Sequence, residues 1–175
     1  FRKEVLSTYK GNRAGKLKPV CYGAVRQWVE DRYDCVSYPT LEADDCVGLL
    51  VDKYKGHEVH ISGDKDFKTI PGVFFDFLHD EWFEISEEQA YKNFLAQVMI
   101  GDAADNYKGC PGIGPKTADK VLEKYGVGWK TVVDQFKKVG LSEGEALQQA
   151  RVAHILNKEE EYDVCKYKVT LWNPN

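Results

Sequence analysis

Long hydrophobic runs are missing from this sequence. No apolar stretch among the 175 residues approaches the ~18 residues that a bilayer-spanning helix needs. The first residues are not a charged stretch followed by an apolar one, as a signal peptide would be. We therefore expect a soluble protein with no membrane partner.

Closely spaced cysteines are also missing. The chain has five, an odd number, and they are scattered, so neither a disulfide framework nor a zinc cluster is indicated. We expect reduced thiols and a cytoplasmic location. There is no internal repeat with a period of 20–50 residues and no low-complexity tract, while 43% hydrophobic residues supply a core for one domain, or for one domain with a small appendage.

Charge is segregated along the chain, although the net value is only −4. Residues 1–20 carry six bases and one acid, and residues 106–138 carry seven bases and three acids. Between them, residues 30–66 hold four bases and ten acids, and residues 76–105 hold one base and eight acids. An acidic centre between basic flanks suits a protein that binds divalent cations in the middle and a polyanion beside them.

Hydrophobic spacing predicts an α/β fold. Residues 58–62 and 73–78 are short segments rich in β-branched or bulky apolar side chains, which is typical of strands. Apolar residues at helical spacing predict helices at about 20–33, 42–54 and 86–100. Since helices alternate with strands, we expect a parallel sheet in the first part of the chain.

The second part is predicted to be helical. The segment GCPGIGP, residues 109–115, has too many glycines and prolines for a helix or strand. Three helices are expected after it: one from Pro115 to Gly126, one from Trp129 to Gly140, and one capped by Ser142 that runs to about Asn157. The alternation of Tyr167, Val169 and Leu171 predicts a short strand in the tail.

Acidic residues cluster at three predicted element boundaries. They are Glu42, Asp44 and Asp45; Asp64 and Asp66; and Asp102 and Asp105. Asp64 and Asp66 directly follow a strand, and functional crevices lie at the carboxyl ends of strands in open α/β sheets. Carboxylates are the ligands that Mg²⁺ prefers, and a two-metal site needs several of them. So many acids in one crevice would repel each other without a cation.

Other interpretations of these acids remain open. Pairs of acids near helix starts also cap helices and complement the helix dipole. An Asp-x-Asp after a strand is found in aspartyl-phosphate phosphohydrolases, but there the second Asp is normally followed by a pair such as Gly-Thr, and here Phe67 and Lys68 follow. No EF-hand calcium loop is present in the sequence.

The turn GIGPKT, residues 112–117, is a candidate anion site. Gly112 and Gly114 let backbone amides approach a phosphate at the start of a helix, and Lys116, Thr117 and Lys120 follow on its first turns. Such a hairpin binds duplex phosphates without reading bases. The alternative is an ordinary helix corner. The segment YKGNR, residues 9–13, offers Lys10 and Arg13 to a phosphate, or is a solvated basic surface.

In order and spacing, the segments LEADD, SGDKDFKTI, IGDAADN and GCPGIGPKTADKVLEKYG resemble the 5′ nuclease family. This family includes flap endonucleases and the 5′–3′ exonuclease domain of DNA polymerase I. The segments RKEVLSTYKGNR and ARVAHILN and the closing LWNP are most similar to T7-type phage 5′–3′ exonucleases. The resemblance covers nearly the whole chain and implies a PIN-like α/β nuclease core.

The resemblance also implies roles for the residues named above. The seven acids match residues that ligate two metals, which we expect to be Mg²⁺, with Mn²⁺ as an alternative. Residues 109–126 match a helix–three-turn–helix element that binds duplex DNA, often with K⁺ at its turn. Lys10 and Arg13 match basic residues that contact phosphate near a helical arch, and the basic arch segment is residues 1–18. We expect residues 1–105 to form the metal-dependent core and residues 106–175 to form the duplex-binding subdomain with its tail.

The chain departs from the family pattern at its beginning. The family starts with a central strand that carries an active-site Asp, and a second Asp precedes the segment RKE; both fall before Phe1. The chain resembles the C-terminal two-thirds of such a nuclease, whose sheet would then have an apolar edge.

Two functions follow from these observations. The first is a metal-dependent 5′–3′ exonuclease or flap endonuclease, acting on DNA as a monomer without a small-molecule cofactor, in the cytoplasm of the host cell if a phage encodes it. RNA–DNA hybrids are an alternative substrate. The second is a catalytically silent fragment that binds duplex DNA.

Overall fold

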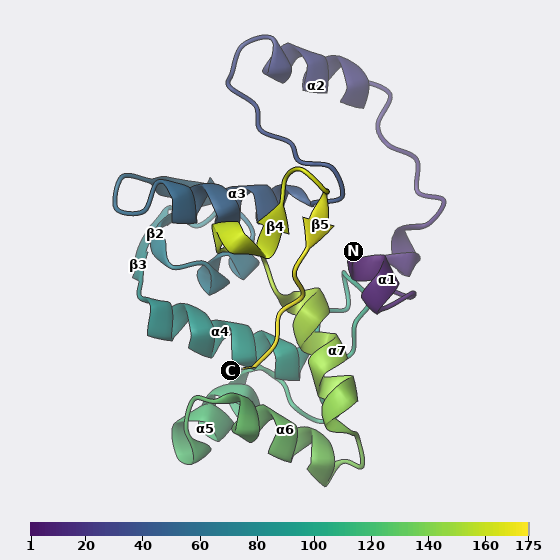
Figure 1. Ribbon diagram of the computed structural model, residues 1–175, viewed down its shortest axis with the longest axis vertical. Coiled ribbons are helices and arrows are strands. Elements are labelled where there is room, and N and C mark those ends of the chain that lie inside the picture. Colours follow the sequence, from purple (N-terminus) through teal and green to yellow (C-terminus); the bar gives the residue numbers. More distant parts are fainter. Residues whose placement is uncertain (175) are drawn as a thin grey trace.

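A three-stranded mixed sheet lies at one side of the protein, between the levels of the helices that precede and follow it in the chain (Figure 1). The computed structural model describes residues 1–174 (Figure 1). Strand β1 (Val59–Ser62) pairs in parallel with β2 (Gly72–Asp76), and β2 pairs antiparallel with β3 (Glu81–Ile85). The parallel pair confirms the prediction from strand texture. Strand β3 was not predicted, because two of the five residues of its sequence EWFEI are charged. It follows a tight turn in which Asp80 has a φ of 56°.

The two faces of this sheet differ. On the inner face, His60, Phe74 and Phe83 lie side by side on the three strands, with His60 and Phe74 stacked at 5.4 Å. The outer face is apolar but open to water: Ile61 is 62% exposed, and Trp82 is 64% exposed although it stacks on Phe75 at 4.7 Å. A large apolar surface in water is uncommon in a monomeric protein.

The six longer helices agree with the spacing in the sequence, whereas a short first helix and three 3-10 turns were not predicted. The helices are α1 (Arg2–Val5), α2 (Tyr22–Glu30), α3 (Ala43–Lys53), α4 (Glu87–Ile100), α5 (Pro115–Tyr125), α6 (Trp129–Lys138) and α7 (Glu143–Ala153), with short 3-10 turns η1 (Gly11–Arg13), η2 (Lys65–Thr69) and η3 (Glu159–Glu161). Helices α4 and α7 begin where predicted: the Ser86 hydroxyl accepts from Gln89 N at 3.1 Å, and Ser142 forms a capping box with Glu145. Helix α7 ends at Ala153, earlier than expected.

The tail confirms the prediction of a short strand. Strand β5 (Lys168–Val169) pairs with β4 (Tyr162–Asp163). A separate core cluster joins α4 to the helices that follow residue 105, through Leu95, Val98, Leu122 and Phe136. The two parts of the chain that we expected to be distinct, 1–105 and 106–175, are thus packed together through one core.

Residues 11–37 form a solvent-exposed excursion. Every side chain in this range is exposed, and Figure 1 shows α2 set apart from the body of the protein, held by two long connections. The predicted helix is present, but its apolar stripe is not buried, since Val25 and Trp28 are both about half exposed. Amphipathic spacing therefore predicted the helix correctly, although its apolar stripe does not pack against the core.

None of the helices within residues 1–174 has the length and apolar content to cross a membrane.

Candidate functional site

Three chain segments carry the predicted acids to one region. Glu42 and Asp44 lie at the start of α3, and Asp102 and Asp105 lie in the loop after α4. Asp64 is the N-cap of η2, just after β1, and Asp66 lies in the first turn of η2. Ion pairs join the segments: Lys65 Nζ is 3.9 Å from Asp102 Oδ2, and Lys10 Nζ is 2.7 Å from Glu42 Oε1 and 3.6 Å from Asp105 Oδ2.

Close backbone packing fixes the loop that carries Asp102 and Asp105. A Cβ on Gly101 would lie 2.4 Å from the carbonyl carbon of Lys108, and a Cβ on Gly109 would lie 2.4 Å from Gly101 N, so both positions require glycine. Asp102 and Tyr107 exchange two backbone hydrogen bonds of 2.9 and 3.0 Å. Asp102 Oδ1 also accepts from the amides of Ala104 and Asp105, at 2.6 and 3.2 Å. The loop is therefore a rigid carrier of its two acids.

Glu42, Asp44 and Asp105 form a first carboxylate group, beside the basic segment. The buried Tyr9 hydroxyl lies 2.9 Å from Glu42 Oε2 and 2.9 Å from Asp105 Oδ2. Arg13 Nη2 donates to Asp105 Oδ1 at 2.6 Å. Burial, and then the neighbouring charge of Glu42, raise the pKa of Asp44.

The Tyr9 hydroxyl lies between two carboxylates that already have basic partners, Lys10 at Glu42 and Arg13 at Asp105. A hydroxyl has one proton, so it donates to only one of the two carboxylates at a time. The other contact, at 2.9 Å, then brings two electron-rich oxygens together without a proton between them. Burial raises the pKa of Tyr9 above its ordinary value, so the hydroxyl keeps its proton. A cation at these carboxylates would remove the repulsion.

Asp64, Asp66 and Asp102 form a second carboxylate group, at the carboxyl end of β1. Burial raises the pKa of Asp66 to about 6, and the charges of Asp64 and Asp102 add to this shift. Gln97 lies against the same carboxyl and donates to the Tyr107 hydroxyl at 3.1 Å. Burial also raises the pKa of Tyr107, and the negative charges of Asp66, Asp102 and Asp105 raise it further. Tyr107 thus lies between the two groups.

Asp45 is set apart from the other six acids. It is fully buried, and both of its oxygens accept from Arg2: Nη1 to Oδ2 at 2.6 Å and Nη2 to Oδ1 at 2.7 Å. The amides of Leu156 and Glu42 donate to the same carboxylate, at 3.2 and 3.1 Å. We expected Asp45 to be a metal ligand. In this structure both of its oxygens already accept hydrogen bonds from protein donors, so neither is free for a metal.

Six carboxylates therefore remain as candidate metal ligands. Within residues 1–174, no three His, Cys, Asp or Glu side chains are gathered into a ready-made metal cage in this conformation. The donor chemistry nevertheless fits a hard divalent cation, since all six ligands are oxygens. Burial, and then the charges of neighbouring acids, raise the pKa of Asp66, so a bound cation would favour its charged form. In this structure Lys10, Arg13 and Lys65 form ion pairs with three of the six carboxylates, those of Glu42, Asp105 and Asp102.

The turn GIGPKT is presented to solvent. Gly112 has a φ of 80°, Gly114 is the N-cap of α5, and Pro115 opens the helix. Lys116, Thr117 and Lys120 are all exposed. A Cβ built on either glycine would meet nothing within 4 Å, so there is space for another molecule against this backbone.

Sequence reasoning missed four residues of the site: Arg2, Tyr9, Gln97 and Tyr107. Tyr9 and Arg2 were within segments we recognised, but a single aromatic or basic residue there carries no signal of its own. Gln97 occupies a helical position that is often simply solvated. Their roles depend on contacts between residues far apart in the chain, such as Tyr9 with Asp105.

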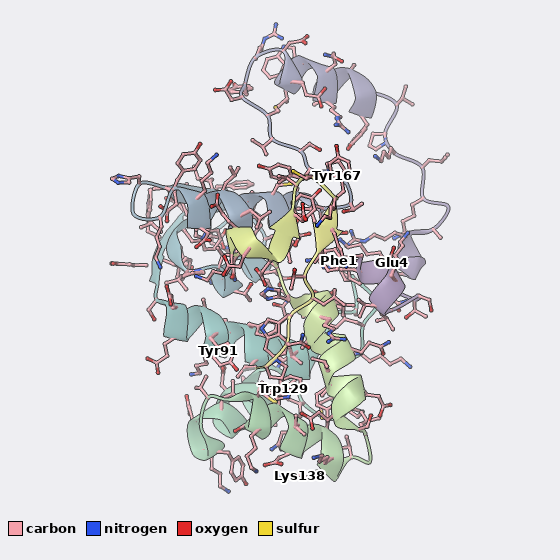
Figure 2. The ribbon with its side chains drawn as sticks, viewed as in Figure 1. Phe1, Glu4, Tyr91, Trp129, Lys138 and Tyr167 are labelled. Carbon is pink, nitrogen blue, oxygen red and sulfur yellow. The ribbon has the colours of Figure 1, made fainter. Side chains whose placement is uncertain are left out.

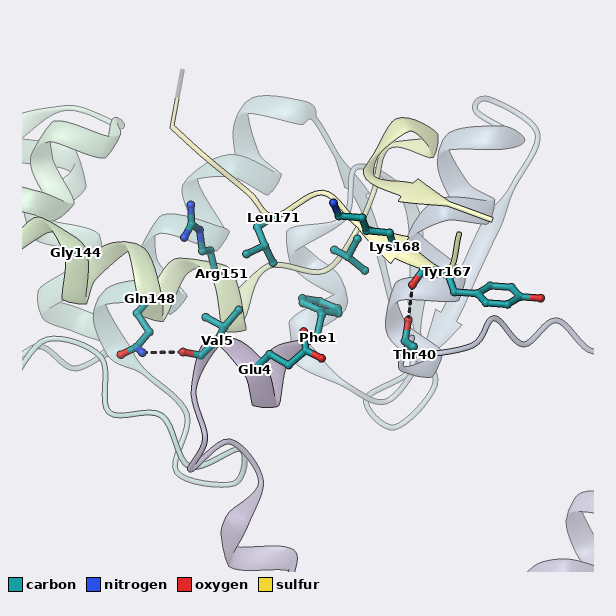
Figure 3. A pocket seen from close by; sticks show the side chains of 11 residues that line it. Phe1, Glu4, Val5, Thr40, Gly144, Gln148, Arg151, Tyr167, Lys168 and Leu171 are labelled. Atoms are coloured by element: carbon teal, nitrogen blue, oxygen red, sulfur yellow. Dashed lines mark hydrogen bonds between the residues drawn. The ribbon is translucent and has the colours of Figure 1, made fainter. Parts of the chain in front are cut away.

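Two hollows lie near these elements. The first hollow has a volume of ≈ 360 Å³ and is lined by Glu42 together with Arg26 and Val29 of α2. The space beside α2 therefore reaches the first carboxylate group. The other, of ≈ 620 Å³, contains none of the predicted site residues (Figure 3). It lies between α1, α7 and the tail, where Gln148 donates to the Val5 carbonyl at 2.7 Å.

Similarity to known proteins agrees with this geometry. No protein-family model matches the chain. The exodeoxyribonuclease of Enterobacteria phage T3 is 30% identical over an alignment that takes in 99% of this chain and 70% of that protein. The exonuclease of Escherichia phage T7 is 29% identical with the same coverage. The flap endonuclease Xni of Aeromonas salmonicida is 32% identical over 72% of this chain and 53% of its own length.

Solved structures share the fold. The flap endonuclease of bacteriophage T5, in a complex with DNA and metal ions, has a TM-score of 0.69 and 19% identity, covering 89% of this chain and 70% of that one. The T5 5′-exonuclease with bound zinc gives the same TM-score and coverage at 21% identity.

Proposed function

Because the chain belongs to the 5′ nuclease family, whose members hydrolyse DNA phosphodiester bonds, we propose that it is itself a metal-dependent 5′–3′ exonuclease and flap endonuclease. The observation that carries this proposal is the meeting of two carboxylate groups beside the cationic side chains of Lys10 and Arg13. A site that holds divalent cations and a phosphodiester together needs these two kinds of group side by side.

The proposed metal ligands are the six acids with free oxygens. The first group, Glu42, Asp44 and Asp105, and the second, Asp64, Asp66 and Asp102, would each hold one Mg²⁺, with Mn²⁺ as a substitute. Bound divalent cations activate water and stabilise the charge that develops on a phosphoryl group. Metal-bound T5 structures support divalent ions in this fold.

Lys10 and Arg13 would change partners when DNA arrives. In the present structure they neutralise Glu42 and Asp105. Once cations take over that task, the two side chains are free to bind a phosphate, Arg13 through the paired donors of its guanidinium. The Tyr9 hydroxyl would then donate its single proton to one of the two carboxylates and orient that one.

Duplex DNA would be held by the turn GIGPKT. A T5 relative of the same fold binds DNA. Exposed backbone at Gly112 and Gly114, with Lys116, Thr117 and Lys120 on the first turns of α5, suits a phosphate backbone read by charge and shape. A K⁺ ion at the turn is part of the proposal. An RNA–DNA hybrid is a second substrate to try.

The test is release of label from a 5′-labelled duplex with a short flap, in Mg²⁺ and in chelator. Replacing Asp64 and Asp66 by Ala is expected to abolish release while duplex binding persists. The matched control is Glu81→Gln with Glu84→Gln, two acids of β3 outside the site, which should cleave normally. Undiminished cleavage by the Asp64→Ala, Asp66→Ala variant would refute the metal assignment.

The second candidate is a duplex-binding protein without catalysis. The basic, exposed turn favours it, because that turn does not depend on the carboxylates. Duplex binding by the unsubstituted chain, with no metal-dependent cleavage, would establish this alternative.

A further inference from the structure

A basic hollow lies at the far end of α5 from the turn GIGPKT. It has a volume of ≈ 640 Å³ and is lined by Tyr125, Lys130, Thr131, Gln135, Lys137 and Lys138, with Asp134. Figure 1 shows α5 and α6 at the end of the protein away from α3, and Figure 2 shows Lys138 on that side. None of the residues assigned to metal or to the turn takes part in it.

The charge of this hollow is positive and largely uncompensated. Residues 124–138 contain four lysines and one acid. Lys124 Nζ and Lys138 Nζ lie 5.0 and 4.9 Å from the centre of the Tyr125 ring. In the part of the chain that the structure describes, neither Lys124 nor Lys137 has a carboxylate partner. The Lys130–Asp134 pair, at 2.6 Å, is highly exposed and so is readily exchanged for another anion.

The lysines of α6 point to one side. Lys137 and Lys138 follow Lys130 by seven and eight residues, about two helical turns, so the three lysines lie on one face of the helix. Several cations on one face of a helix suit an extended polyanion better than a single small anion.

A sequence repeat indicates which polyanion this is. The segment GVGWKT, residues 126–131, repeats the pattern of GIGPKT, residues 112–117, fourteen residues later. The backbone repeats it too: the first glycine has a φ of 80° in one turn and 93° in the other, and the second glycine is the extended N-cap of the helix. In both turns the space beside each glycine is open.

We propose that the hollow around Tyr125 is a second contact for the phosphate backbone of the duplex that the turn GIGPKT binds. This inference rests on the proposed function and adds a binding surface to it. Helix α5 has eleven residues and spans about 16 Å, the axial length of about five base pairs. The second contact therefore lengthens the bound duplex by up to that amount.

The test compares the triple variant Lys130→Ala, Lys137→Ala, Lys138→Ala with the unsubstituted chain. Binding to hairpin-closed duplexes of about 6 and about 20 base pairs is measured by fluorescence anisotropy in chelator, across a salt series. The matched control is Lys53→Ala with Lys55→Ala at the end of α3, where Lys53 Nζ also lies beside a tyrosine, 5.3 Å from the Tyr54 ring.

The triple variant is expected to lose about tenfold in affinity for the long duplex and little for the short one, with a salt slope smaller by about 2. The control should match the unsubstituted chain. An unchanged affinity and salt slope, or an equal loss on both lengths, would overturn the second contact while leaving the proposed function standing. Failure of the unsubstituted chain to bind either duplex would overturn both.

Discussion

Arg2 and Asp45 form a buried bidentate ion pair, with nitrogen–oxygen distances of 2.6 and 2.7 Å. Arg2 also donates to the carbonyls of Val152 and His154, at 3.0 and 2.6 Å. The pair therefore joins α1 and the end of α7 to the start of α3, which carries Glu42 and Asp44.

Replacing Arg2 by Met leaves the Asp45 carboxylate buried without a partner. We expect the free energy of unfolding to fall by about 3–5 kcal/mol, because an uncompensated buried charge is costly. Urea unfolding measures this. Adding Asp45→Asn to the Arg2→Met variant removes that charge and should recover part of the loss. A variant as stable as the original would contradict a structural role for the pair.

Removing the Tyr9 hydroxyl should weaken metal binding. Tyr9→Phe takes away the proton that the hydroxyl donates to Glu42 or to Asp105, and loss of such a supporting hydrogen bond typically costs about 10–100-fold in metal affinity. Titration calorimetry with Mn²⁺ is the measurement. The control is Tyr162→Phe, which removes a buried hydroxyl bonded to the Pro39 carbonyl, away from the carboxylates. Equal affinity in both variants would remove Tyr9 from the site.

The metal-free protein should become less stable as pH rises toward neutrality. The pKa of Asp66 is about 6, against 3.8 ordinarily, so between these values the folded state holds a proton that the unfolded state has released. The unfolding free energy therefore falls across this window, by at most about 3 kcal/mol and by less given partial solvent access. In chelator, Asp66→Asn should raise the melting temperature at pH 7 and flatten the slope. No change in the slope would contradict the burial of a carboxylate there.

His60 should make the fold sensitive to acid. It is 4% exposed, and neither ring nitrogen has a hydrogen-bond partner among residues 1–174. Burial lowers the pKa of His60 below 6.5, so the unfolded chain takes up a proton first as pH falls through 6.5, and stability is lost below that value. His60→Phe keeps the stack on Phe74 and should add about 1–2 kcal/mol by removing two unsatisfied polar atoms. Chemical unfolding at pH 7.5 and 5.5 compares the two; a variant that keeps the acid sensitivity points to another group.

Charge at the turn should control duplex affinity. Lys116→Ala with Lys120→Ala removes two exposed cations, so we expect weaker duplex binding and a salt slope smaller by about 2. Anisotropy over a salt series shows it. A salt slope equal to that of the unsubstituted chain would mean that the turn does not contact phosphate.

Local features of the sequence predicted most of the helices, because their start and stop signals are local. Ser86, Ser142 and Pro115 each stand where a helix begins, and Gly126 stands where one ends. Strands β1 and β2 were also predicted. Strand β3 was not, because what holds it is pairing with Phe74 and Phe75 on the neighbouring strand and not any preference of its own residues.

The acids of the candidate site were predictable as a set but not in their separate environments. Asp44 and Asp45 are adjacent in sequence, yet one remains available and the other is sealed by Arg2. That difference depends on Arg2, 43 residues from Asp45, and on Leu156, 111 residues away. Local patterns in one sequence do not contain such contacts.

The open face of the sheet gives the protein an optical signal of its own. Trp82 stands on that face with its indole mostly in water. An indole in water emits at longer wavelength than a buried one, so any molecule that covers Val59, Ile61 and Phe75 will shift the emission of Trp82 to the blue. With Trp28 replaced by Phe to remove the other strongly exposed indole, this shift would report coverage of the sheet without an added dye.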